Sequence, residues 1–144
     1  MTESQRIEAL AQHLELTGDE WNEVTVSSYD GTLLEYGQQE YLVLTDEESD
    51  NRVVEYIRET IWAFRPGFLA RHSVMSFDFY VAIEVFEALQ EKCEDSNDTV
   101  LALIKDFDAL VADAVDADKR GHFLSCYDGE ENDAAHGLFI YRTN

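Results

Sequence analysis

The sequence predicts an α+β fold in which an antiparallel sheet of four to five strands, built from both chain ends, packs on three to four helices. Three observations support this prediction. Short segments typical of strands gather near the two ends of the chain, the middle carries apolar residues at helical spacing, and one short pattern occurs once near each end. An antiparallel sheet packed on helices is the simplest arrangement that buries all of these apolar faces.

The length and composition are those of one folded domain. The chain has 144 residues, a length that one domain commonly fills, so we expect a single acidic α+β domain over residues 1–144. Hydrophobic residues make up 45% of the sequence, which is enough for a packed core despite the high charge. A single proline, Pro66, leaves no proline-rich linker that would mark a domain boundary.

The N-terminal segment predicts one helix followed by strands. Thr2 and Gln5 have the spacing of a capping box, and apolar residues at helical spacing follow them. Gly18 is expected to end this helix. Alternating or apolar runs then predict strands over residues 21–28, 33–36 and 41–44.

A second helix is predicted directly after the third expected strand. Thr45 and Glu48 form a clearer capping box, and the acidic residues between them favour the positive end of the helix dipole. An apolar stripe continues to Phe64, after which Pro66 interrupts the pattern.

Two further helices are expected to form an antiparallel pair. One covers about residues 77–93, with Ser73 and Ser76 as candidate N-cap residues, and the other carries apolar residues over 100–115. Because the loop at residues 94–97 is short, the two helices should be antiparallel neighbours. The residues expected to face one another are Phe79, Ile83, Phe86 and Leu89 on one helix and Ile104, Phe107 and Val111 on the other.

One sequence pattern occurs near both ends. Residues 27–31 (Ser-Ser-Tyr-Asp-Gly) return as residues 125–129 (Ser-Cys-Tyr-Asp-Gly), and the same offset of 98 pairs Tyr41-Leu42-Val43 with Phe139-Ile140-Tyr141. Asp and Gly tolerate the backbone conformations of tight turns, so each end should form a hairpin, the second from residues 122–127 and 138–142. Shared turn chemistry is the favoured interpretation, and a duplicated ligand site on the two Tyr-Asp-Gly turns is the alternative.

The charge excludes several classes of protein. The chain has 31 acidic and 10 basic residues, a formal net charge of −21, which disfavours direct binding of nucleic acid and of anionic membranes. No apolar run approaches the roughly 20 residues of a membrane-spanning helix, and the first residues do not resemble a secretory signal. Cys93 and Cys126 are too few and too far apart for a disulfide framework, so we expect reduced thiols and a cytoplasmic protein.

No set of residues indicates a reaction. His122, Cys126, Asp128 and His136 could converge on zinc, but their spacing is not a standard metal-binding pattern. Ser73 and Ser76 near His72 lack a nucleophile elbow, and the glycines form no phosphate-binding loop. We therefore expect no catalytic residue, no metal and no cofactor, and a protein that is not an enzyme.

Four arginines lie within 20 residues of one another: Arg52, Arg58, Arg65 and Arg71. They could form a pocket for a small anion. The favoured interpretation is pairing with neighbouring carboxylates, especially of Arg58 with Glu55 and Glu59.

The strongest functional indication is a row of acidic residues. Between Ser73 and Asp118 there are 12 acidic residues and 2 lysines, many of them opposite the apolar stripes. The predicted partner-binding face consists of Glu84, Glu87, Glu91, Glu94, Asp95, Asp98, Asp106, Asp113 and Asp116. The whole chain carries about as much negative charge as ten base pairs of duplex DNA, which makes mimicry of DNA physically feasible. Solubility alone, or a halophilic source, would explain the same acidity.

Two segments resemble a known group of proteins. Glu40-Tyr41-Leu42-Val43-Leu44-Thr45-Asp46-Glu47-Glu48, with Ile61-Trp62-Ala63-Phe64, resembles small acidic proteins encoded by bacteriophages and mobile elements. Tyr127-Asp128-Gly129-Glu130-Glu131-Asn132, with the final residues 139–144, resembles the end of the same group. The resemblance covers about a third of the chain and implies an accessory phage-type protein, a class that includes anti-restriction and anti-CRISPR inhibitors.

These observations lead to one functional hypothesis. The protein is expected to bind a basic surface of another protein, such as a DNA-binding cleft, and to inhibit a DNA-targeting defence system by DNA mimicry. It would act in the host cell cytoplasm, as a monomer or homodimer. The alternatives are an acidic interaction or scaffold module without catalytic function, and a small metal- or ligand-binding enzyme.

Overall fold

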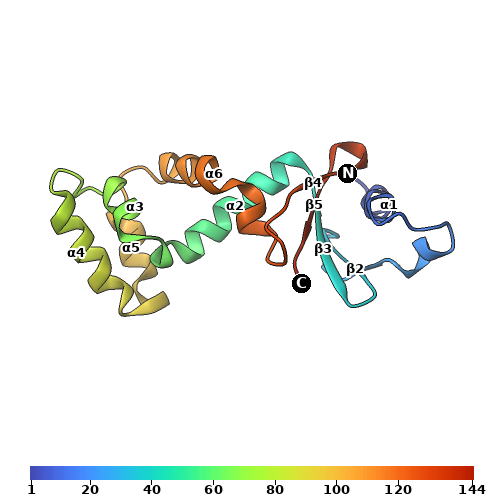
Figure 1. The fold of residues 1–144 in the computed structure, drawn as a ribbon, viewed down its shortest axis with the longest axis horizontal. Coiled ribbons are helices and arrows are strands. Elements are labelled where there is room, and N and C mark those ends of the chain that lie inside the picture. The colour runs from blue at the N-terminus through green and yellow to red at the C-terminus, as the bar shows by residue number, and fades with distance from the viewer. The chain divides into compact units, whose positions relative to one another are not determined.

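In the computed structural model, which describes residues 1–144, the chain forms six α-helices and a five-stranded antiparallel sheet (Figure 1). The helices are α1 (Glu3–His13), α2 (Asp46–Thr60), α3 (Pro66–Arg71), α4 (Phe79–Gln90), α5 (Asn97–Leu103) and α6 (Phe107–Leu124). The strands are β1 (Thr25–Val26), β2 (Leu33–Tyr36), β3 (Gln39–Leu44), β4 (Asn132–Asp133) and β5 (Phe139–Arg142). The predicted α+β class, with an antiparallel sheet built from both chain ends, is confirmed.

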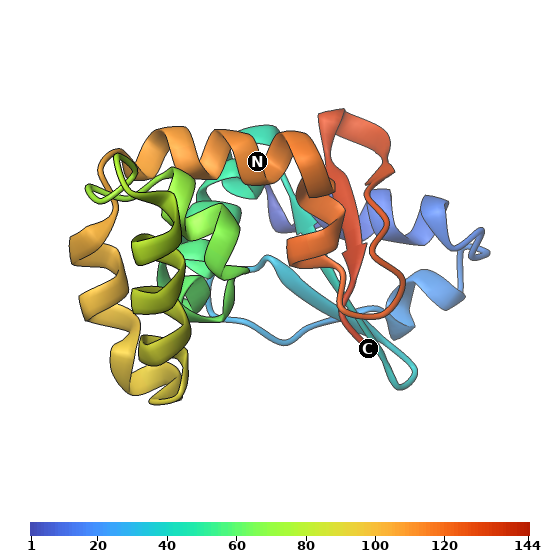
Figure 2. The same ribbon diagram turned by 60° about the vertical axis from the view of Figure 1, so that its left-hand side comes forward.

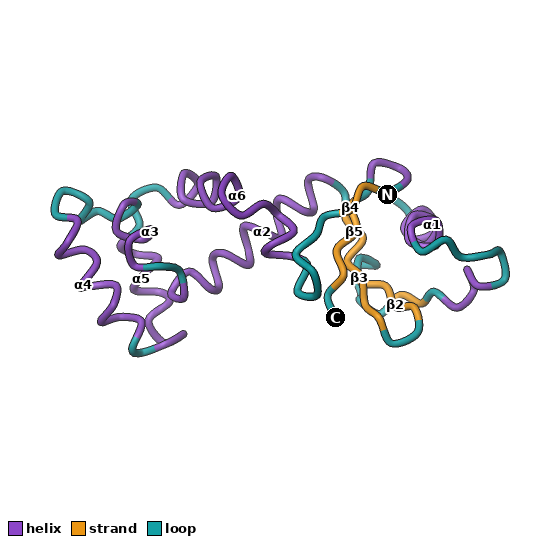
Figure 3. The backbone as a smooth tube through the Cα atoms, in the orientation of Figure 1, coloured by secondary structure: helices purple, strands orange, loops and turns teal.

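The chain packs as two compact units. Unit 1 contains Met1–Val53 and Asp118–Asn144, and unit 2 contains Val54–Ala117. Figure 3 shows that the strands all belong to unit 1, whereas unit 2 consists of helices and their connections. The single domain expected over residues 1–144 stays a prediction, which one cooperative unfolding transition would support.

The sheet of unit 1 joins the two ends of the chain. Its strand order is β1-β2-β3-β5-β4, and the central pair β3 and β5 places Tyr41 opposite Arg142 and Val43 opposite Ile140. Ala9 and Leu10 of α1 belong to the same buried cluster as Val43 and Ile140, so α1 covers one face of the sheet. Because side chains alternate along a strand, the neighbouring Tyr141 points to the opposite face, where it is also fully buried.

Both predicted capping boxes are present. The Thr2 hydroxyl accepts a hydrogen bond from the Gln5 backbone, and the Gln5 side chain accepts one from the Thr2 backbone. Thr45 and Glu48 make the same reciprocal pair at 3.1 and 3.2 Å at the start of α2. These contacts satisfy amide groups that would otherwise have no partner at a helix N-terminus.

The two copies of the Tyr-Asp-Gly pattern lie in related but unequal surroundings. Asp30 and Gly31 lie in the connection between β1 and β2, as predicted. The expected strand over residues 122–127 is wrong, because these residues end α6 and continue into helical turns: Ser125 donates to Gly121 and Gly129 donates to Ser125. The second hairpin is formed by β4 and β5 instead.

The helical core of unit 2 differs from the predicted one. α4 packs most extensively on α3, and the apolar residues of unit 2 with no exposed surface are Ile57, Ile61, Leu69, Ala70, Ala82, Phe86, Val100 and Leu110. Of the predicted facing residues, Phe86 is buried as expected. Phe79 is 38% exposed, and Ile104, Phe107 and Val111 are only partly buried, so the predicted stripe is displaced by a few residues.

The last predicted helix is in fact two helices, α5 and α6. The backbone amide of Lys105 donates to His72 at 2.8 Å, and that of Val74 donates to Leu103 at 2.9 Å. Around residues 103–106 the backbone therefore bonds to the His72–Val74 segment instead of continuing the helix, and the chain changes direction there. The predicted N-cap residues Ser73 and Ser76 are not at the start of α4, which is capped by Asp78 instead.

The expected strand over residues 21–28 is shorter than predicted. A 3-10 helix occupies Glu20–Glu23, and only Thr25–Val26 pair with β2. None of the helices in the structure combines the length and apolar character needed to cross a membrane.

Candidate partner-binding surface

The nine acidic residues predicted as a partner-binding face all lie in unit 2 and are all exposed. Six of them follow one another from α4 through a 3-10 helix (Cys93–Ser96) into the first turn of α5. We call these six the acidic row: Glu84, Glu87, Glu91, Glu94, Asp95 and Asp98. The other three belong to α6 or to the residue that precedes it.

The geometry of α4 explains why its glutamates are exposed. Glu84, Glu87 and Glu91 recur at intervals of three and four residues and therefore lie on one side of the helix. Ala82 and Phe86 lie on the opposite side and are fully buried. The three carboxylates span about 10 Å of helix axis, a charge density approaching that of one DNA strand.

The other three acidic residues, in α6 and directly before it, have a different setting. Asp106 accepts a hydrogen bond from the Ala109 backbone at 3.1 Å and so caps α6, and Asp113 forms an ion pair with His72 at 2.8 Å. Figure 2 shows that the first turns of α6 (orange) are steeply inclined to α4 (yellow-green) and do not run alongside it. The structure thus divides the predicted face into two groups, and Asp106 and Asp113 have roles within the chain.

None of the six residues of the acidic row takes part in an ion pair within the chain. Because no cation of the chain pairs with these carboxylates, they repel one another, and a positively charged partner would reduce this repulsion. The acidic row is therefore the part of the predicted face that is free to meet a partner.

Unit 1 contains the opposite arrangement, in which carboxylates surround an arginine. The side chain of Arg120 is only 13% exposed and forms ion pairs with Asp46, Asp50 and Glu131 at 2.7 to 3.0 Å. Burial by itself lowers the pKa of Arg120, but the hydrogen bonds to these carboxylates outweigh it and raise the pKa above the ordinary value. The Tyr141 hydroxyl also donates to Glu131, and burial together with this bond raises the pKa of Tyr141.

The two Tyr-Asp-Gly turns use their aspartates to hold the turn. Asp30 accepts hydrogen bonds from the Thr32 and Ser28 side chains, which place its pKa well below the usual range, and it pairs with Arg52 at 2.8 Å. Asp128 accepts a hydrogen bond from Ser125, which lowers its pKa in the same way. Because both carboxylates are already occupied, the structure favours shared turn chemistry over a duplicated ligand site.

The residues weighed for metal binding and catalysis are not assembled into a site. His136 pairs with Glu8 at 3.1 Å, and no group of three or more His, Cys, Asp or Glu side chains is arranged to hold a metal ion. The Ser73 hydroxyl is buried and donates to the Ala70 carbonyl, and the neighbouring His72 ring contacts Asp113. Cys93 and Cys126 are both exposed, free thiols.

The four clustered arginines are distributed over the two units. Arg52 belongs to unit 1, where it pairs with Asp30. In unit 2, Arg58 lies over the Phe107 ring at 4.7 Å, rather than pairing with Glu55 or Glu59 as expected, and Arg71 lies over Phe68. The guanidinium groups therefore stabilise aromatic packing, as cations over ring faces do, and do not form an anion pocket.

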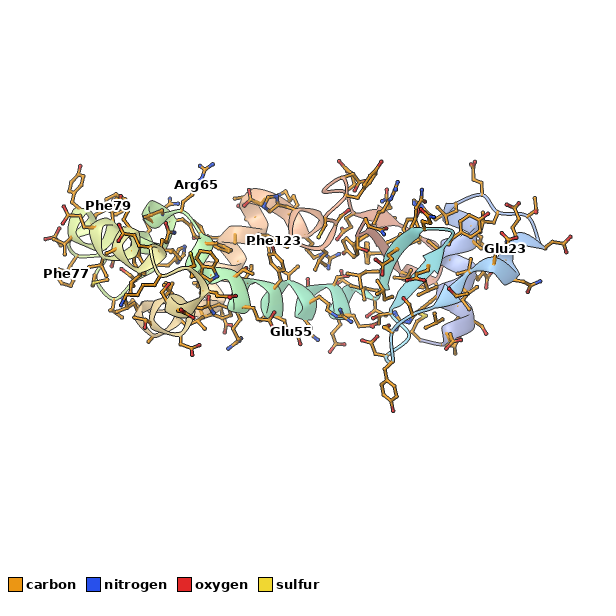
Figure 4. All side chains as sticks on the ribbon, turned by 90° about the horizontal axis from the view of Figure 1, so that it is seen from below. Glu23, Glu55, Arg65, Phe77, Phe79 and Phe123 are labelled. Carbon is orange, nitrogen blue, oxygen red and sulfur yellow. The ribbon has the colours of Figure 1, made fainter.

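Sequence reasoning missed a group of exposed apolar residues next to the acidic row. We call Val74, Phe77, Phe79, Tyr80 and Val81 the apolar patch; all five are exposed, with Phe77 at 88% and Tyr80 at 79%. Figure 4 shows Phe77 and Phe79 near one another at one end of the helical unit. One indication was available in the sequence: Phe77-Asp78-Phe79-Tyr80-Val81 contains more large apolar residues than one buried face of a helix can take up.

The fold and this surface define a class: an acidic α+β protein with a five-stranded antiparallel sheet and a helical unit that carries an unpaired acidic row beside an apolar patch. No protein-family model, no curated protein and no solved structure matches the chain.

Proposed function

We propose that this chain is a non-enzymatic binding protein whose acidic row occupies a basic, DNA-binding surface of another protein. In this proposal it is an inhibitor of a DNA-targeting host defence system, of the kind that phages and mobile elements encode, and it acts in the host cell cytoplasm. The observation that carries the proposal is that six consecutive exposed carboxylates, from Glu84 to Asp98, have no ion-pair partner within the chain.

The contrast with Arg120 supports this interpretation over solubility alone. Where the protein uses carboxylates for its own stability, they converge on an arginine, as Asp46, Asp50 and Glu131 do. The acidic row has no such arginine, although Arg58, Arg65 and Arg71 belong to the same unit. A surface that keeps its negative charge in this way is suited to a positively charged partner, whose approach it would accelerate.

The test is capture of partners from bacterial lysate at 0.1 M and 1 M salt, followed by mass spectrometry. The Debye length falls from about 10 Å to about 3 Å over this range, so a partner held by complementary charge should be released. Duplex DNA should compete with the protein for the same partner, because both would occupy one basic surface.

Two charge-matched variants sharpen the test. Changing Glu84, Glu87 and Glu91 to Gln should weaken capture. The control, in which three exposed and unpaired acidic residues of unit 1 are neutralised (Glu3→Gln, Glu15→Gln and Asp19→Asn), should leave capture unchanged. Equal capture at both salt concentrations, or failure of DNA to compete, would overturn the proposal.

A further inference from the structure

The apolar patch is concentrated at one place in the chain. Nine large hydrophobic side chains are exposed in the whole protein, and five of them fall between Val74 and Val81. Single exposed apolar residues are ordinary on protein surfaces, whereas a contiguous group is typical of an interaction site. Phe77 and Tyr80 are 88% and 79% exposed, so burial in the core of this chain does not account for them, although the Tyr80 ring lies 5.9 Å from that of Phe79.

The patch and the acidic row share one side of α4. Tyr80, Glu84, Glu87 and Glu91 follow one another at three- or four-residue intervals, so their side chains lie along one face of the helix. Phe77 lies just before this face, on the N-terminal side of the Asp78 cap. The exposed face of α4 is therefore apolar in its first turn and acidic in the turns that follow. We call Phe77, Tyr80, Glu84, Glu87 and Glu91 the α4 face.

The order of residues on the α4 face specifies the chemistry of its partner. The carboxylates require lysine or arginine opposite them, and Phe77 and Tyr80 require an apolar surface that excludes water. A cationic amphipathic helix supplies both, because a helix surface packs along another helix over several turns and can place apolar and basic residues on one side. Proteins that bind DNA commonly present such basic helices to the major groove.

A second copy of the chain does not meet these requirements. Two α4 faces brought together would set one acidic row against another, in molecules that each carry a formal charge of −21. An anionic membrane surface is opposed by the same repulsion.

We infer that the α4 face docks a cationic amphipathic helix of another protein, with Phe77 and Tyr80 as apolar anchors and Glu84, Glu87 and Glu91 as the charge-matching residues. This inference rests on the proposed function, since it assigns the chemistry of the partner to the same acidic row. The anchors provide affinity after contact, and the carboxylates provide orientation and rate of approach.

The probe is a pair of synthetic helical peptides of equal charge. One has leucines in its central turn and lysines in the turns on both sides, so that it can dock in either direction. The other has alanines in place of the leucines. Binding of each peptide to the full chain is measured by fluorescence anisotropy at 0.1 M and 1 M salt.

We expect the leucine peptide to bind about tenfold more tightly than the alanine peptide. Phe77→Ser with Tyr80→Ser should reduce this ratio to nearly one, whereas Tyr29→Ser, which removes a fully exposed tyrosine from unit 1, should leave it unchanged. Circular dichroism and the melting temperature establish that each variant is folded.

The possible outcomes separate this inference from the proposed function. If the ratio survives loss of Phe77 and Tyr80 while binding remains salt-dependent and sensitive to Glu84→Gln, Glu87→Gln and Glu91→Gln, the anchors are wrong and the electrostatic proposal stands. If neither salt nor these glutamine variants affect peptide binding, the proposed function fails as well. If wild-type protein sediments as a dimer that the Phe77 and Tyr80 variant dissociates, the occupant is a second copy and the inference is overturned.

Discussion

The two units of this protein use their carboxylates in opposite ways. Unit 1 has 18 acidic and 5 basic residues, a formal charge of −13, and unit 2 has 13 acidic and 5 basic residues, a formal charge of −8. Arg6, Arg52 and Arg120 of unit 1 each pair with carboxylates that are more than 10 residues away in the sequence. In unit 2, His72 Nε2 lies 2.8 Å from the Asp113 carboxylate, and none of the six carboxylates of the acidic row has an ion-pair partner.

The difference shows that the amount of charge does not locate a binding surface. Unit 1 is the more acidic of the two, yet many of its carboxylates join one element to another, as Glu48 does by pairing with Arg6 at 2.9 Å. Hydrogen bonds from Arg6 and Thr45 outweigh the burial of Glu48 and lower its pKa, so this carboxylate contributes to the stability of the fold. The carboxylates available to a partner are those without such bonds, and in the acidic row six of them follow one another along the chain with no bonded carboxylate between them.

The largest expected effect on stability comes from truncating the core of unit 2, and it tests whether the two units unfold separately. Phe86→Ala removes a fully buried ring from unit 2 and should cost about 3–5 kcal/mol of unfolding free energy. Chemical denaturation followed by circular dichroism measures this loss. A single shifted transition would support one domain, and a second transition that keeps its midpoint would show that unit 1 unfolds independently. Tyr80→Ala, which removes an exposed ring from the same helix, is the control and should have little effect.

The next largest effect on stability is expected at Gly121, where two backbone segments of unit 1 lie close together. A Cβ at Gly121 would come within 2.9 Å of the Glu130 carbonyl carbon and the Glu131 nitrogen, so the backbone would have to move. Gly121→Ala should therefore cost about 2–3 kcal/mol. Gly18→Ala is the control, because a Cβ at Gly18 meets nothing within 4 Å. Equal urea midpoints for both variants would contradict the close contact.

Replacing Arg120, which pairs with three carboxylates, should lower the unfolding free energy nearly as much. Arg120→Met leaves Asp46, Asp50 and Glu131 without their shared cation and should cost about 2 kcal/mol, less than for a fully buried ion pair because Asp46 and Asp50 are largely exposed. Arg65→Met, at an exposed position in unit 2, should change stability by less than about 0.5 kcal/mol. Thermal denaturation compares the two variants. An equal loss of stability in both would contradict the conclusion that arginine–carboxylate pairs stabilise unit 1 in particular.

A smaller effect depends on pH. Hydrogen bonds from Thr32 and Ser28 hold the pKa of Asp30 well below its ordinary value of 3.8, so the folded state binds this proton less readily than the unfolded state. The contribution of Asp30 to stability is therefore complete above about pH 4 and is lost as the pH falls below it. Because the side chain is 53% exposed, we expect about 1 kcal/mol or less.

Asp30→Asn tests this dependence. The variant should be less stable than wild type at pH 6 and should lose less stability between pH 4 and pH 2, as measured by urea denaturation. An unchanged slope in this range would mean that Asp30 does not contribute to the acid sensitivity of unit 1.

The smallest effect on stability is expected for the acidic row. Changing Glu84, Glu87 and Glu91 to Gln removes no contact within the chain and relieves repulsion, so the unfolding free energy should stay within about 0.5 kcal/mol of wild type or rise slightly. Differential scanning calorimetry at low salt measures this. A clear loss of stability would show that the row supports the fold and would weaken its assignment as a binding surface.

The sequence by itself determined the features that depend on near neighbours. Thr2 with Gln5 and Thr45 with Glu48 cap their helices through partners three residues away, so their spacing alone was informative. The strands β2, β3 and β5 follow from short apolar or alternating runs, and the exposure of Glu84, Glu87 and Glu91 follows from their position opposite the apolar residues of α4.

The tertiary structure decided the features that depend on distant partners. The helix predicted over residues 100–115 breaks because Lys105 and Leu103 bond to His72 and Val74, about 30 residues earlier in the chain. The sequence placed Phe79 on the predicted buried stripe and could not show that its ring remains 38% exposed, because helical spacing gives the angles between residues but not how far the packing covers each one. That coverage is decided by packing, and in unit 2 α3 packs on the side of α4 that contains Ala82 and Phe86.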